Sequence, residues 1–473
     1  MSLSFERTPV QAEQEEHLEA VLRSLFTDQA RQLARETGFV QRRSPIDGAA
    51  FAQTMVFGFL DEPDASYTDL QQILAAQKVV VSPQAIEKRM KESAACFLHR
   101  MVESLLTVLL VGESCSLELL SGFKGVYLQD GTIIELPDAL HEHWRGFTKD
   151  PQMGTRAGLR VQVRLELLHG QLQGPWLQPA RADERSGPSS IEEHPLPAGC
   201  LYVTDSKHVT FARMRRHNEA GRYWLAPATL CYKVIDQQGL CWELPNLIAT
   251  RVKQGHQVID EPVRLGVQDR VPCRLIAVPN PAVKHPTPAQ VDRRPRIKGS
   301  RHDVQIGRKK AFKSQTKCKH HRESPRRREL SHWIVLVTNV PASHLSAQQA
   351  RELLRARWQE ELLWKLWKQS NHLDVWRSEK PMRILCELYA KLIGVIVQHW
   401  FTLLGCWQDA HRRLVKASKA VKKLAVSVVL TLTGETLTLR SVVTRSQSLM
   451  QRCQLNPRFK HPNTSQHLIW ASG

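Results

Sequence analysis

Residues 357–368 read RWQEELLWKLWK. The pattern predicts a long helix, which Ser346 caps and which runs to about Gln369. At 100° per residue, four of its side chains fall within about 60° of one another. One face of the helix would then carry a carboxylate between two cations, with an aromatic ring beside it. The four residues are Arg357, Glu361, Trp364 and Lys368.

This face also has a purely structural explanation. Glu361 is four residues from both Arg357 and Lys365, so either pair can form an ordinary ion pair along the helix. Three leucines on the opposite face would pack against the protein. They are Leu362, Leu363 and Leu366. Acidic residues outside the helix are needed to decide between a surface ladder of charges and a catalytic face.

Two aspartates each follow a short apolar strand: Asp130 after the segment that begins at Val126, and Asp205 after residues 201–204. A single aspartate in such a place is usually a turn former. Two of them on neighbouring strands can converge on one point, and Glu361 would supply a third carboxylate. Such hard oxygen ligands suit Mg²⁺ or Mn²⁺, and two of these ions can drive a phosphoryl transfer.

The charge of the chain indicates a polyanionic partner. Its 473 residues include 66 Lys and Arg against 46 Asp and Glu, a net charge of +20. Nucleic acid is the commonest partner of such a protein. Residues 284–328 hold 16 Lys and Arg and three acids, which is +13, with too few apolar residues for a core. We interpret them as a loop or loosely ordered arm that contacts DNA.

The remaining composition indicates a soluble cytoplasmic protein. None of the ten cysteines forms a CxxC pair, which favours a reducing compartment. Residues 1–19 are polar and acidic and do not resemble a signal peptide. The most apolar segment, 386–406, is interrupted by charged and polar side chains, so it predicts a core helix rather than a membrane span.

Residues 12–120 predict a helical N-terminal region. Within it, a short helix precedes a second one that begins at Ser82-Pro83, an N-cap followed by proline in the first turn. The pair is either a helix-turn-helix that places Lys88 and Arg89 in a DNA groove or a plain helical hairpin.

From Gly125 onward, alternating apolar residues predict strands. Residues 159–168 and 172–177 are expected to pair as a hairpin across His169-Gly170. Further strands are expected at 224–235, 240–253, 271–278 and 333–337.

These motifs resemble the DDE transposases of bacterial insertion sequences, in the class with the signature Tyr-x2-Arg-x3-Glu-x6-Lys (the insertion-sequence four family). Arg357, Glu361 and Lys368 match the last three positions, and Leu354 stands at the tyrosine position. Asp130, within Tyr-Leu-Gln-Asp-Gly-Thr, matches the first aspartate.

The resemblance extends over about residues 42–400. The second aspartate is assigned to Asp205, although Ser-Lys-His follows it where the class more often has a glycine and an aromatic residue. Asp183 and Asp236 are competitors that are less well placed after an apolar strand.

The resemblance implies a ribonuclease-H-like core with a β-rich insertion between the second aspartate and the glutamate. Asp130, Asp205 and Glu361 would hold two Mg²⁺ or Mn²⁺ ions. The enzyme would nick double-stranded DNA at the terminal inverted repeats, and the freed 3′-hydroxyl would attack target DNA. Arg357 and Lys368 would grip phosphates near the scissile bond. A homodimer is expected when two transposon ends are bound.

Some members of the class pass through a DNA hairpin and stack a flipped base on a tryptophan that precedes the glutamate. Trp333 is similarly placed, at the start of the strand before the Glu361 helix. Stacking lowers the cost of unpairing a base. The alternative is that Trp333 is a core or sheet-edge residue.

The sequence thus predicts an α/β protein: a ribonuclease-H-like mixed sheet core with a β-rich insertion, flanked by helical regions. The predicted function is cut-and-paste DNA transposition. The alternatives are a catalytically decayed DNA-binding relative or repressor, and a general nuclease with the same core. The expected boundaries are 1–120 for the N-terminal DNA-binding region, 121–240 and 333–400 for the catalytic core, 241–332 for the insertion with its basic arm, and 401–473 for the C-terminal helices.

Overall fold

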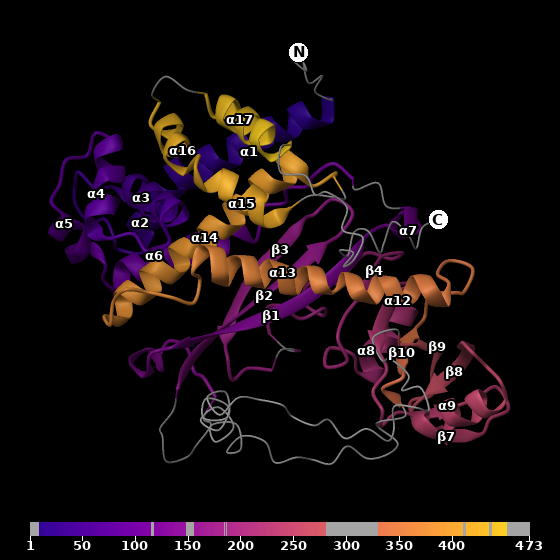
Figure 1. The fold of residues 1–473 in the computed structure, drawn as a ribbon. Helices are drawn as coiled ribbons and strands as arrows, with labels where there is room; N and C mark the ends of the chain where they lie inside the picture. Colours follow the sequence, from indigo (N-terminus) through magenta and orange to yellow (C-terminus); the bar gives the residue numbers. More distant parts are fainter. Residues whose placement is uncertain are drawn as a thin grey trace, which may run out of the picture. The chain divides into compact units, whose positions relative to one another are not determined.

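The computed structural model divides into two compact units, Met1–Ala226 with Glu352–Gly473, and Pro227–Arg351 (Figure 1). The basic arm expected at 284–328 lies outside the described residues. The structure describes residues 9–114, 118–147, 156–183, 185, 187–280, 330–409, 413–434 and 438–451.

The first unit is built on five strands in the order β3-β2-β1-β4-β5. Neighbours β3, β2 and β1 run antiparallel, whereas β1, β4 and β5 run parallel, so the sheet is mixed. This sheet and the surrounding helices confirm the predicted α/β class, and the β2–β3 pairing confirms the predicted hairpin. The strands are β1 (Val126–Leu136), β2 (Ala157–Glu166), β3 (Leu172–Pro179), β4 (Leu201–Val203) and β5 (Tyr223–Pro227).

Strand β2 is buried along its whole length, with apolar side chains on one face and polar ones on the other. Hydrogen bonds hold the end of the polar face that carries Arg164. Arg164 donates to Gln129 Oε1 across the strand pair and to the carbonyl of His194, and Gln129 donates to the carbonyl of Ser189. These polar groups tolerate burial because they have partners. The 189–194 segment is thereby fixed against the sheet.

Helices before, between and after the strands in the chain complete the first unit. The longest, α14 (Pro381–Cys406), is long and apolar enough to cross a membrane, yet its most apolar window is entirely buried within the protein. It packs against α3, α6, α15 and α17, as expected for a core helix. The other helices are α1 (Pro9–Ser24), η1 (Leu25–Gln29), α2 (Ala30–Glu36), α3 (Gly48–Asp61), α4 (Tyr67–Ala76), α5 (Pro83–Arg89), α6 (Glu92–Leu105), α7 (Glu118–Ser121), η2 (Asp138–Leu140), α8 (Phe211–Glu219), α15 (Leu414–Lys422), α16 (Ala425–Leu432) and α17 (Leu439–Gln451).

The second unit contains antiparallel strands in the order β10-β9-β8-β6-β7. The strand expected at 240–253 is wrong over most of its length, because only its start is extended. Pro245 lies in the first turn of a helix there, a position where its missing N–H costs nothing. The elements are β6 (Lys233–Ile235), β7 (Cys241–Glu243), α9 (Leu244–Lys253), β8 (Ile259–Leu265), β9 (Val271–Pro279) and β10 (Trp333–Thr338).

The single helix expected from Ser346 to about Gln369 is instead three pieces. Ser346 does cap the first, since its Oγ accepts from the backbone N–H of Gln349 at 3.2 Å. The helix breaks at Arg357 and later widens into a π-helical turn. The predicted faces are therefore wrong in part: Trp364 is 6% exposed, whereas Leu362 is 39% exposed. The pieces are α12 (Ala347–Ala356), α13 (Trp358–Lys365) and η4 (Leu366–Ser370).

Candidate active site

Strand pairing brings the two predicted aspartates together. The parallel pairing of β1 with β4 sets Leu128 opposite Val203, and Asp130 and Asp205 each lie two residues further along. Because side chains alternate along a strand, Asp130 leaves the sheet on the same side as Leu128. Asp130 is on β1 itself, and Asp205 begins the turn after β4.

The charge of Glu361 influences the Asp130 carboxyl. Burial raises the pKa of the Asp130 carboxyl, and the nearby carboxylates of Asp205 and Glu361 raise it further. The backbone N–H of Gly131 and the guanidinium of Arg357 act in the opposite direction. Asp130 therefore lies within electrostatic range of both other predicted carboxylates and of one cation.

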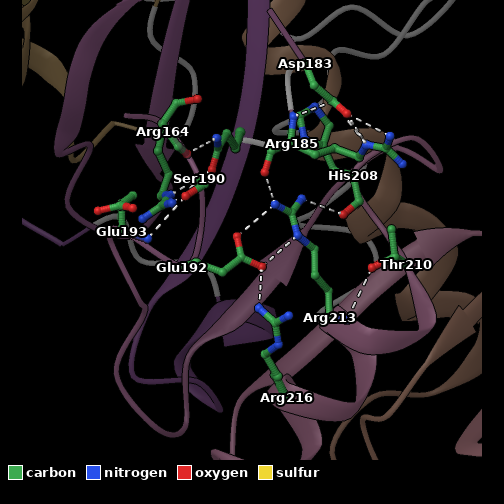
Figure 2. Close-up of polar contacts among 12 residues, drawn as sticks. Arg164, Asp183, Arg185, Ser190, Glu192, Glu193, His208, Thr210, Arg213 and Arg216 are labelled. Carbon is green, nitrogen blue, oxygen red and sulfur yellow. Dashed lines mark hydrogen bonds and ion pairs between the residues drawn. The ribbon is translucent and has the colours of Figure 1, made fainter. Parts of the chain in front are cut away.

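Asp205 is held in a tight turn. Its Oδ1 accepts hydrogen bonds from the backbone N–H groups of Lys207 at 2.9 Å and His208 at 3.1 Å. Figure 2 shows Arg213, from α8, between this turn and Glu192. Arg213 donates to the carbonyl of His208 at 3.2 Å and pairs with the Glu192 carboxylate at 2.8 Å. The turn that presents Asp205 is thus fixed by a largely buried arginine.

The two competing aspartates are engaged elsewhere. Asp183 pairs with Arg185 at 2.8 Å, and hydrogen bonds from that arginine lower the pKa of Asp183 to about 2. Asp236 lies in the second unit and accepts hydrogen bonds from Trp242 Nε1 and from the backbone N–H of Leu240, which is the behaviour of a turn former. These contacts support Asp205 as the second carboxylate.

Arg357 lies at the break between α12 and α13, beside the carboxylates. Its Nη2 is 3.8 Å from Glu361 Oε1, and both side chains are about one third exposed. A partly exposed ion pair of this kind contributes little to stability, so stability does not explain why Arg357 lies here. A partly exposed guanidinium at this point can also meet an incoming phosphate.

Lys368 contacts the sheet rather than Glu361. Its Nζ donates to the carbonyl of Ile133 on β1 at 3.1 Å and lies 3.9 Å from Asp374. The structure therefore brings Arg357 and Glu361 together, and it ties Lys368 to the strand that carries Asp130. Helix α13 packs against the same strand (Figure 1).

The sequence interpretation missed Glu360. This side chain is fully buried, and neither of its carboxyl oxygens has a hydrogen-bond partner among the residues that the structure describes. Burial raises its pKa well above the ordinary value, and the charge of Asp130 raises it further. The available signal was the apolar stripe of α13: Glu360 stands at helical spacing from Leu363, Trp364 and Trp367, all of which are buried.

The donor set fits a hard divalent cation, since it consists of carboxylates without sulfur or imidazole. Within the described ranges, no three acidic, histidine or cysteine side chains lie close enough together to hold a metal ion. Like charges repel one another, and a bound cation removes that repulsion. Glu360, a buried carboxyl beside Asp130 that accepts no hydrogen bond from the described residues, marks an excess of acidic groups that a cation would relieve.

The other predicted DNA contacts are on α5 and β10. On α5, Lys88 is exposed, but Arg89 is half-buried, donates to Ser44 Oγ and lies 5.4 Å from the ring centre of Phe39. Of the two, only Lys88 offers its charge freely to a groove. Trp333 begins β10 in the second unit, where it pairs with Pro279 and is half-buried.

Comparison with known proteins shows which proteins this chain is similar to. The profile of the transposase DDE domain family matches residues 121–396. The transposase of insertion sequence element IS231F from Bacillus thuringiensis subsp. israelensis is 24% identical over 408 residues, 82% of this chain and 80% of the relative. That of IS231C from subsp. berliner is 23% identical over 424 residues, 85% and 83% of the two chains. That of IS1151 from Clostridium perfringens is 33% identical over 61 residues, 13% of each.

Proposed function

Because the chain belongs to the family of transposases with a DDE domain, we propose that it moves an insertion sequence by a cut-and-paste mechanism. The observation that supports the catalytic assignment is the β1–β4 register, which pairs Leu128 with Val203 two residues before each aspartate, together with the influence of Asp205 and Glu361 on the pKa of Asp130. In the proposed mechanism these three carboxylates hold two Mg²⁺ or Mn²⁺ ions.

The ions, when bound, would activate the attacking oxygen and stabilise the leaving oxygen of each strand cleavage and strand transfer. The chain itself would position the reacting groups. The turn and Arg213 fix the backbone that presents Asp205, so this carboxylate would need little ordering to contribute a ligand. Arg357 would neutralise a DNA phosphate next to Glu361. Lys368, bonded to the Ile133 carbonyl, would keep the helix in register with β1 as well as contribute positive charge.

The proposed partner is double-stranded DNA with terminal inverted repeats, bound by a homodimer that holds two ends. The basic segment 284–328 would supply the general attraction to the phosphate backbone. Lys88 would contact DNA from the N-terminal helices, and Trp333 would stack on an unpaired base. These contacts extend the proposal and are separable from the chemistry of the three carboxylates.

The test is strand cleavage of a duplex that carries the inverted repeats flanking the gene. The full chain should nick the repeat ends with Mg²⁺ or Mn²⁺ and not with EDTA, and it should spare a duplex with scrambled repeats. Cutting of both duplexes alike would indicate a general nuclease instead.

A second candidate is a decayed relative that binds DNA without cutting it. One observation favours it: Leu354 stands where the signature of the class has a tyrosine, so a hydroxyl that could contact a phosphate is missing. Salt-sensitive binding to the repeats without any metal-dependent nicking would establish this alternative. Restoring nicking with Leu354→Tyr would show that the loss is caused by this one position.

A further inference from the structure

A cationic pocket opens beside the Asp205 turn. It has a volume of about 460 Å³ and lies within the first unit. Its lining includes four cations and a single acid, and two of its residues directly follow Asp205 in the chain. The charged lining residues are Arg160, Arg181, Asp183, Arg185 and Lys207.

The one acid does not neutralise the pocket. Asp183 is taken up by Arg185, whose Nη2 is 2.8 Å and whose Nε is 3.1 Å from its carboxylate oxygens. Arg181 and Lys207 are exposed, and neither forms an ion pair with an acid in the part of the chain that the structure describes. Arg160, almost fully buried, adds a third positive charge. The pocket therefore keeps a net positive potential that a polyanion would satisfy.

The walls of the pocket are held in place before any ligand arrives. Arg213 donates to the carbonyl of Arg185 on one side and to the carbonyl of His208 on the other, and Glu192 clamps its guanidinium (Figure 2). The segment with Arg185 and the turn with Lys207 are thus joined through one side chain. Preorganised donors bind a ligand without the cost of ordering them first.

The position of the pocket indicates what it binds. Lys207 is two residues from Asp205, so a DNA strand whose phosphate reached Asp205 would continue past the pocket. A volume in the range of small-ligand sites admits a nucleotide unit. Phe147, 46% exposed, adds an aromatic ring to the lining. Proteins that bind nucleic-acid strands commonly combine cations, which contact phosphates, with aromatic rings, on which bases stack.

We propose that this pocket binds the phosphodiester backbone of DNA next to the scissile phosphate, an inference that rests on the proposed function. It gives a role to Ser206-Lys207-His208, which replaces the glycine and aromatic residue more usual in the class. The substitution supplies a cation to the pocket through Lys207.

The experiment measures binding of a fluorescein-labelled 20-base-pair duplex of mixed sequence to the full chain, in EDTA, between 50 and 200 mM salt. In Arg181→Gln/Lys207→Gln, removal of two cations that pair with phosphates should lower the slope of log Kd against log salt by about 2 and weaken binding about tenfold. Arg181→Lys/Lys207→Arg keeps both charges and should bind as the native protein does. Arg35→Gln/Lys253→Gln removes two exposed charges elsewhere and should change the slope by less than about 0.5.

An unchanged slope in Arg181→Gln/Lys207→Gln, or an equal loss in the Arg35/Lys253 control, would overturn the pocket proposal. Cleavage of the repeat duplex by the native protein separates this result from failure of the proposed function. If the native protein cuts and the pocket variant binds normally, only the pocket proposal fails. If the native protein does not cut but the pocket variant loses binding as stated, the pocket stands as a DNA site and the proposed catalysis fails.

Discussion

Glu360 and Glu361 are neighbours in the chain with opposite surroundings. Glu361 is one third exposed beside Arg357, whereas Glu360 is fully buried, with no hydrogen-bond partner for either oxygen in the described part of the chain. A buried polar group without a partner costs free energy, because the water that it loses is not replaced. The helix therefore carries one carboxyl that we propose to act in catalysis and one that destabilises the metal-free fold.

Replacement of Glu360 by methionine, which has a similar volume and no polar oxygen, should raise the free energy of unfolding by about 1–3 kcal/mol in metal-free buffer. Urea denaturation followed by circular dichroism measures this change. Glu361→Gln is the matched control and should alter stability by less than about 0.5 kcal/mol. A less stable Glu360→Met protein would contradict this account, because it would mean that the carboxyl makes a favourable contact.

His217 gives the first unit a dependence on pH. Its ring stacks on Tyr202 of β4 with centres 5.7 Å apart, and burial, followed by the charge of Arg222, lowers its pKa from 6.5 to about 4. In the unfolded chain the imidazole binds a proton below pH 6.5, whereas in the folded protein it does so only below about pH 4. Stability should therefore fall as the pH falls through that window.

Between pH 7 and pH 5 this one group should lower the free energy of unfolding by about 2 kcal/mol. His217→Phe keeps a ring against Tyr202 and cannot take up a proton. Urea unfolding at both pH values should show a smaller loss for the variant by about that amount. Equal losses in the two proteins would mean that His217 is not the group responsible.

Single residues could be predicted from the sequence where a chemically suitable side chain stands at the spacing of a motif. Asp130 and Glu361 follow from motif spacing, and Asp205 from the short strand before it. Glu360 was overlooked although it stands on the apolar stripe of the helix, because an acidic side chain is rarely buried and only the packing shows that this one is. Arg213 is similar: its partners are two backbone carbonyls and the Glu192 carboxylate, which only the fold brings together.

Helix α14 is almost entirely buried, and its few charged residues have partners inside the protein. Lys391 and Glu387 are each 1% exposed and form an ion pair at 2.9 Å. Lys391 also donates to the carbonyls of His372 and Val375, in the loop that follows the Glu361 helix. The charged residues that interrupt the apolar sequence of α14 therefore connect this helix to the loop that follows the Glu361 helix.

Lys391→Met should cost about 3–5 kcal/mol of stability, because it leaves the Glu387 carboxylate buried without its cation. The double variant Lys391→Met/Glu387→Met removes that charge as well. It should recover at least about 1 kcal/mol, with the remaining deficit due to the two loop carbonyls that lose their donor. Thermal or urea unfolding of both variants tests this, and a double variant no more stable than the single one would disprove it.

Element boundaries were predictable where a local signal fixes them, as at the Ser346 cap and the hairpin at His169-Gly170. The break at Arg357 was not, because no proline or glycine marks it and the flanking residues all favour helix. The helix α9 was mistaken for a strand since its β-branched residues suit both structures, and packing decided between them.

The whole molecule has a very uneven distribution of charge. Residues 284–328 carry +13 of the net +20, so most of the long-range attraction for a polyanion resides in one segment of the sequence. The pocket beside Asp205 is a second, local concentration of positive charge. We expect the segment to set the general affinity for DNA and the pocket to align the strand at the carboxylates.

Replacing residues 284–328 with an uncharged linker of equal length should lower the salt dependence of DNA binding by more than the two-residue pocket variant does. The slope of log Kd against log salt falls by about 0.9 for every phosphate that the protein no longer neutralises. A scrambled segment with the same composition should retain the native slope. Loss of the slope in the scrambled protein would show that sequence, not charge, carries the interaction.

The fold class, the mixed sheet and the family were within reach of the sequence, because strand alternation and motif spacing are local properties. The division of the chain was harder to see. The second compact unit extends from Pro227 to Arg351. Its limits depend on which strands pair, and β8 was not expected at all.

The most direct test of the catalytic assignment compares two neighbouring substitutions, Glu361→Gln and Glu360→Gln, in cleavage of the terminal-repeat duplex with Mn²⁺. If Glu361 is a metal ligand, Glu361→Gln should slow nicking by on the order of 10³-fold or more, with Kd for the duplex unchanged. Glu360→Gln should cut within about tenfold of the native rate. Nicking at the native rate by the Glu361→Gln protein would contradict the account.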